Sequence, residues 1–72
     1  MPCQLRARID LAINEMLEMI EQTPLGGNID FLNGYLHALG EADLIPCSEI
    51  LRIRRRSVEI LQTAVAQHKL AH

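Results

Sequence analysis

Few residues in this chain have side chains that act as nucleophiles, bases or metal ligands. His68 and His72 stand four positions apart, a spacing that places two histidines on one face of a helix and that can bind zinc. No third ligand accompanies them, and no glutamate stands between them as in a metalloprotease motif. We therefore predict neither a metal ion nor another cofactor.

The remaining candidates for catalysis have simpler structural explanations. Ser48 and Ser57 suit a helix cap and a packing position, and Gly26-Gly27 lacks the Lys-Ser/Thr that follows in a phosphate-binding loop. A chain of 72 residues also offers little volume for a concave pocket. We predict that the protein is not an enzyme and has no catalytic residues.

The most distinctive charged pattern is the run Arg52-Ile53-Arg54-Arg55-Arg56. On a helix, three of these arginines lie on the outward side, where a basic patch can bind an acidic partner or phosphates. They are Arg52, Arg55 and Arg56. A solvated run of charges is the simpler alternative for them.

Arg54 differs from its neighbours because it falls inside an apolar helical stripe. An unpaired charge buried there would be costly. Its stem is expected to run along the core with its head at the edge, or its guanidinium to form an ion pair across helices or subunits. The candidate acidic partners are Glu15, Glu18, Glu21 and Asp43.

Charge is segregated along the chain, although the net charge is only −2. Arg6 and Arg8 stand early in the first expected helix and the glutamates late, which opposes the helix dipole, and the arginine run opposes it in the third. Both mismatches would disappear if the acidic end of the first helix lay beside the basic start of the third, within a subunit or across a dimer.

Three helices account for the apolar periodicity. The first covers residues 4 to about 23 and ends before Pro24 and Gly26-Gly27; the second begins at Asn28 as N-cap and stops at Gly40; the third begins at the cap Ser48 and runs to about residue 70. Gly34, inside the second helix, is expected to permit close approach of another backbone. Leu44 and Ile45 are expected in the core.

Each expected helix has a broad apolar face. In the first it comprises Leu5, Ile9, Ala12, Ile13, Met16, Met19 and Ile20; in the second, Ile29, Leu32, Tyr35, Leu36 and Leu39, widened by Phe31 and Ala38; in the third, Ile50, Leu51, Ser57, Val58, Leu61, Ala64 and Val65, extended by Ile53 and Ile60. The third face covers nearly half the circumference, whereas a surface helix needs a stripe about 100° wide.

This surplus of apolar surface predicts association with another chain. Hydrophobic residues make up 49% of the sequence, and a domain of this size buries only about 60% of the surface that its unfolded chain exposes. We predict an all-α fold in one domain, residues 1–72, a three-helix bundle or open helical hairpin with two long helices and a short middle one, completed by homodimerisation. The dimer core is expected from Ile53, Ile60, Met16, Met19 and Leu17.

The functional prediction is a small helical protein–protein interaction module, an adaptor, inhibitor or chaperone-like regulator, that acts as a homodimer and binds a further protein, acidic in character. Its partner-binding residues would be Arg52, Arg55, Arg56, Ile53 and Ile60. The alternative is a small DNA-binding regulator that uses the basic third helix, but nucleic acid is disfavoured because the domain is acidic overall and the connection from Gly40 to Cys47 is long for a helix-turn-helix. A salt titration with a random duplex separates the two.

The compartment is predicted from what the sequence lacks. The N-terminus has no signal-peptide core, and no apolar run approaches the roughly 18 residues of a membrane span. Cys3 and Cys47 are too few for a disulfide framework. We therefore expect a cytoplasmic protein that does not enter a membrane.

Overall fold

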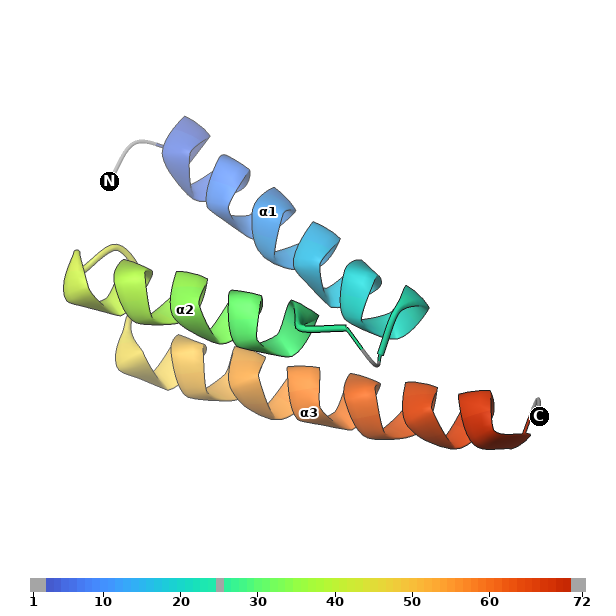
Figure 1. Cartoon of the computed structure of the whole chain (residues 1–72). Coiled ribbons are helices and arrows are strands. Elements are labelled where there is room, and N and C mark those ends of the chain that lie inside the picture. The colour runs from blue at the N-terminus through green and yellow to red at the C-terminus, as the bar shows by residue number, and fades with distance from the viewer. Residues whose placement is uncertain (1–2, 25, 71–72) are drawn as a thin grey trace.

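The computed structural model describes the backbone of residues 3–24 and 26–70 and the side chains of residues 4–24 and 26–67. It contains three helices, α1 (Cys3–Gln22), α2 (Asn28–Glu41) and α3 (Cys47–Leu70). Successive helices are antiparallel, so α1 and α3 run in the same direction, and every pair of helices is in contact (Figure 1). The predicted all-α fold with two long helices and a short middle one is confirmed, and it is a bundle rather than an open hairpin.

The core lies where the three helices meet. α2 contributes one clean stripe of buried leucines, and the α2–α3 connection adds Ile45, as predicted. The buried hydrophobic residues are Ile9, Ile13, Leu17, Ile20, Leu32, Leu36, Leu39, Ile45, Ile50 and Ala64. Within residues 3–24 and 26–70, no helix has the length and hydropathy needed to cross a membrane.

The inner face of α1 is rotated from the predicted one. Leu17, which we expected in a dimer core, is buried in the core of the three-helix bundle, whereas Leu5 and Met19 are exposed. Phe31 of α2 is also 66% exposed, so the prediction that it widens the inner face is wrong. Met16, Met19 and Phe31 together border a shallow depression on the outside of α1 and α2.

Asn28 closes the end of α1 instead of capping α2. Gly27 occupies the N-cap position of α2, and Asn28 makes no cap hydrogen bond there. Its Nδ2 donates to the carbonyls of Met19 and Thr23, each at 3.2 Å. The same two carbonyls accept backbone hydrogen bonds from the amides of Thr23 and Gly26, so Asn28 adds a second bond to each and links the start of α2 to the end of α1.

Gly40 has a packing role in α2, which continues past it to Glu41. The left-handed residue of the connection is Asp43, with φ of 55°. A Cβ at Gly40 would lie 3.0 Å from Cδ1 of Ile50, so the absence of a side chain at Gly40 leaves room for Ile50 of α3. At Gly34 a Cβ would meet nothing within 4 Å, so no other described segment of this chain makes the close approach predicted there.

We expect the two glycines to respond differently to alanine. Gly34→Ala should raise the free energy of unfolding by about 1 kcal/mol, because alanine is the better helix former and the site has space. Gly40→Ala should gain much less or lose stability, because the new methyl group presses on Ile50. Urea unfolding of both variants at one protein concentration measures the difference; equal gains would contradict the packing assigned to Gly40.

A salt bridge between Arg6 and Glu49 joins the start of α1 to the start of α3. Arg6 Nη2 donates to Glu49 Oε2 at 2.6 Å, and Arg6 Nε donates to Asp10 Oδ1 at 3.1 Å. These two bonds, that to Glu49 foremost, raise the pKa of the Arg6 guanidinium above its ordinary value. The start of α3 thus lies beside the start of α1, so the predicted contact with the acidic end of α1 is not made at this point.

The face that α3 buries is centred on Ser57. Ile50, Ser57 and Ala64, spaced by seven residues, are buried, and Ile53 and Ile60 pack half-buried against the core. Leu51 and Val58, predicted on the inner face, are 56% and 43% exposed. The helix begins at Cys47, where the carbonyl of Pro46 accepts hydrogen bonds from the amides of Glu49 and Ile50, so Ser48 lies within the first turn and not at the predicted cap position.

Candidate partner-binding surface

A second apolar row follows α3 beside the buried one. Leu51, Arg54, Val58, Leu61 and Val65 alternate at spacings of three and four residues, the pattern by which one helix packs along another. Arg54, Leu61 and Val65 are half-buried, and Leu51 and Val58 are exposed. We call these five residues the Arg54 seam.

Arg54 is the polar centre of this seam. Its Nε atom is buried and has no hydrogen-bond partner, although its backbone carbonyl accepts a bond of 2.7 Å from the Ser57 hydroxyl. Buried N–H donors in folded proteins nearly always have an acceptor. Leaving one unsatisfied costs about 1–3 kcal/mol, so Arg54 is an exception that calls for an explanation.

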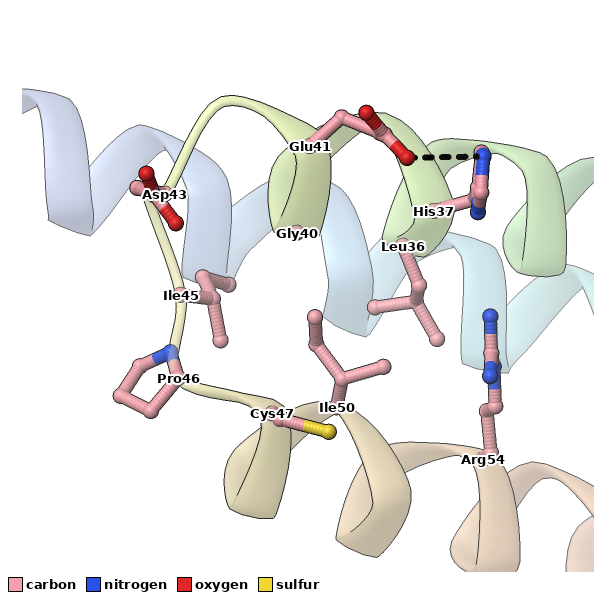
Figure 2. A pocket seen from close by; sticks show the side chains of 10 residues that line it. All are labelled: Leu36, His37, Gly40, Glu41, Asp43, Ile45, Pro46, Cys47, Ile50 and Arg54. Atoms are coloured by element: carbon pink, nitrogen blue, oxygen red, sulfur yellow. Dashed lines mark ion pairs between the residues drawn. The ribbon is translucent and has the colours of Figure 1, made fainter.

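The surroundings of Arg54 form a depression between α2 and α3. Figure 2 shows the Arg54 side chain rising from α3 towards α2, on the side of His37, while Leu36 and Ile50 lie deeper between the helices. Cys47 borders the same depression with a free, exposed thiol. His37 is 3.6 Å from Glu41, a contact that is an ion pair only when the imidazole is protonated.

Three of the acidic residues predicted to pair with Arg54, namely Glu15, Glu18 and Glu21, lie on α1, whereas Asp43 borders the same depression as Arg54 but forms no ion pair with it. Glu15 and Glu18 are exposed on α1, whereas the depression around Arg54 is bordered by α2, α3 and their connection. Among the described side chains, Arg54 forms no ion pair. The described part of the chain therefore offers no acceptor to the Nε of Arg54.

The predicted partner-binding residues are divided between two sides of α3. Arg52, Ile53 and Arg56 border one depression between α1 and α3, and Ile60 borders its continuation. Arg55 is exposed but borders neither. Four of the five predicted residues therefore line one groove between α1 and α3, and Arg55 lies apart from them.

Sequence reasoning did not find the Arg54 seam as an exposed surface. It recognised that Arg54 falls in a stripe with Leu51, Val58 and Leu61, but assigned that stripe to the core. The signal that could have found it is the second heptad pattern, offset by one residue from Ile50, Ile53, Ser57, Ile60 and Ala64. Periodicity alone does not say which row is buried.

The structure describes only part of the residues that were considered as metal ligands. Within residues 4–24 and 26–67, no three His, Cys, Asp or Glu side chains gather as metal ligands; the side chains of Cys3, His68 and His72 lie outside these residues.

α2 and α3 lie side by side and antiparallel (Figure 1), whereas the helices of a helix-turn-helix meet at about 90–120°. Searches of protein-family models, curated proteins and solved structures found no match to this chain.

Proposed function

We propose that this protein is a helical interaction module whose Arg54 seam receives an apolar helix carrying a carboxylate from another protein. The observation that carries the proposal is the buried Nε of Arg54, which has no hydrogen-bond partner, within a row of exposed and half-buried apolar side chains. A helix laid along this row would cover Leu51 and Val58 by ordinary helix-in-groove packing. Its carboxylate would supply the acceptor that Arg54 lacks, in a charge-assisted hydrogen bond.

Charge favours a different protein over a second copy of α3 at this seam. The only charged member of the seam is Arg54, and Arg55 is exposed nearby on the same helix. Two such seams facing each other would supply no carboxylate for either Arg54, and in a parallel pairing in register they would bring the two arginines together, where like charges cost several kcal/mol. A partner helix with one acidic residue among apolar ones fits both the shape and the charge, as suits an adaptor or inhibitor.

Selection from a displayed library of amphipathic helical peptides tests the proposal. The wild-type chain should enrich peptides with heptad-spaced apolar residues and one Asp or Glu among them. Arg54→Met should enrich the same apolar pattern without the acid. Leu51→Asn with Val58→Asn should weaken binding of the enriched peptides by about tenfold or more, since burying a leucine is worth about 1.5–3 kcal/mol.

Leu11→Asn is the matched control, because Leu11 is 59% exposed on α1 and does not belong to the seam. It should bind the enriched peptides as tightly as the wild type. Enrichment without an acidic position, or the same acidic position with Arg54→Met, would contradict the role given to Arg54. Equal losses from the Leu11 variant and the Leu51/Val58 variant would contradict the location.

A further inference from the structure

His37 borders the same depression as Arg54, from the α2 side. Its side chain is 70% exposed, so a helix that covers the Arg54 seam can reach the imidazole. Figure 2 shows the Arg54 side chain extending from α3 towards His37, with both residues at the end of the depression away from Asp43. A polar group bound between α2 and α3 at this end therefore lies near both the guanidinium and the imidazole.

Four other titratable or charged side chains border this depression. Glu41 lies on α2, Asp43 on the connection, and Cys47 and Arg54 on α3. Among the described side chains, Glu41 is the one ion-pair partner of His37, and its Oε1 is 3.6 Å from Nε2 of the imidazole. Both side chains are largely exposed, and exposed pairs of this kind are weak because water screens them.

The second ring nitrogen of His37 is free of that contact. A protonated imidazole donates from both nitrogens, and Nδ1 has no hydrogen-bond partner among the described residues. In Figure 2 this nitrogen lies on the side of the ring that faces Arg54. The depression thus presents two donors from two helices, Arg54 Nε and His37 Nδ1, to one bound acceptor.

We propose that His37 is a second contact for the partner's carboxylate and that its protonation strengthens the complex; this inference rests on the proposed function. A carboxylate accepts hydrogen bonds at both oxygens, so one oxygen binds Arg54 Nε and the other binds His37 Nδ1. In the free chain, a protonated His37 adds a positive charge beside that of Arg54, and the bound carboxylate offsets both.

Protonation and binding are therefore coupled, and the coupling is reciprocal. The complex holds the proton of His37 more firmly than the free chain does, so binding tightens as the pH falls. Imidazoles gain their charge between about pH 8 and pH 5, whereas Asp and Glu side chains in peptides protonate only near pH 4. The partner's carboxylate thus stays charged across the range in which His37 changes.

Titration with an enriched acidic peptide at about pH 7.5 and about pH 5.5 tests this inference. The wild-type chain should bind the peptide about threefold to tenfold more tightly at the lower pH, because the second charge-assisted hydrogen bond forms only with the protonated imidazole. His37→Gln should bind equally at both pH values. The same peptide with Gln in place of its acidic residue should bind the wild-type chain without pH dependence.

Calorimetry in two buffers of different ionisation enthalpy measures the protons taken up on binding. At about pH 6.5 the wild-type chain should take up a measurable fraction of a proton, and His37→Gln should take up none. Glu41→Gln is the matched control, because it removes the exposed pair on α2 and leaves the acceptor on the partner, so the pH dependence should persist. Circular dichroism at both pH values establishes that each variant is folded.

Failure of this inference and failure of the proposed function give different results. Equal binding of the wild-type chain at both pH values would overturn the role of His37 while leaving that of Arg54 intact. A pH dependence that persists in His37→Gln, which still contains His68 and His72, would do the same. If Arg54→Met binds the acidic peptide as tightly as the wild type, the proposed function fails and this inference fails with it.

Discussion

Leu32→Ala is expected to lower the free energy of unfolding by about 2–5 kcal/mol, because it leaves a cavity where the three helices meet. Leu32 is fully buried and lies in the short helix, which packs on both long ones. Domains have roughly 0.05–0.15 kcal/mol of stability per residue, so this loss is a large fraction of what a 72-residue chain possesses. The variant should be partly unfolded before any denaturant is added.

Urea unfolding followed by circular dichroism measures this effect, with all variants at one fixed chain concentration. Leu11→Ala removes the same atoms from an exposed position and should change stability by less than about 0.5 kcal/mol. A similar change in both variants would show that the core described here is wrongly placed.

Arg54→Met is expected to raise the free energy of unfolding of the free chain and to weaken its binding of an acidic helix. Methionine keeps an apolar stem of similar length and removes the unsatisfied Nε donor, so the free chain should gain about 1 kcal/mol, the lower end of the cost of such a group because Arg54 is only half-buried. Binding of an acidic helix should fall by about thirtyfold or more, since truncating one member of a buried charge pair costs about 2–5 kcal/mol.

Both halves of this prediction are measured on one protein, by urea unfolding of the free chain and by titration with an enriched peptide. Arg55→Met, which removes an exposed arginine one position away, is the control and should change neither quantity appreciably. Loss of stability in Arg54→Met would mean that the guanidinium supports the fold, and Arg54 would then have no need of a partner.

The helices themselves could be predicted because local signals agree at their boundaries. Pro24, Gly26-Gly27 and the segment around Pro46 interrupt three periodic stretches, and the leucines of α2 lie on one narrow stripe. The connection after Gly40 was also predicted to bury Ile45, and it does. These features depend on residues close together in the sequence.

The rotation of α3 could not be predicted in the same way. Two heptad rows lie side by side on this helix, and the one containing the small polar Ser57 is buried while the one containing Leu51 and Val58 is exposed. The choice depends on which row fits against α1 and α2, and the small Ser57 side chain permits close packing there. The same limit applies to Asn28, whose side chain suits either a helix start or the end of the preceding helix.

We propose that Arg54 binds a carboxylate on the helix of another protein. A double-mutant cycle tests it most directly, with Arg54→Met in the protein and Glu→Gln at the acidic position of an enriched peptide. We expect a coupling energy of about 1.5 kcal/mol or more, as for close charge pairs across interfaces. Additive effects of the two changes, with no coupling between them, would contradict the claim.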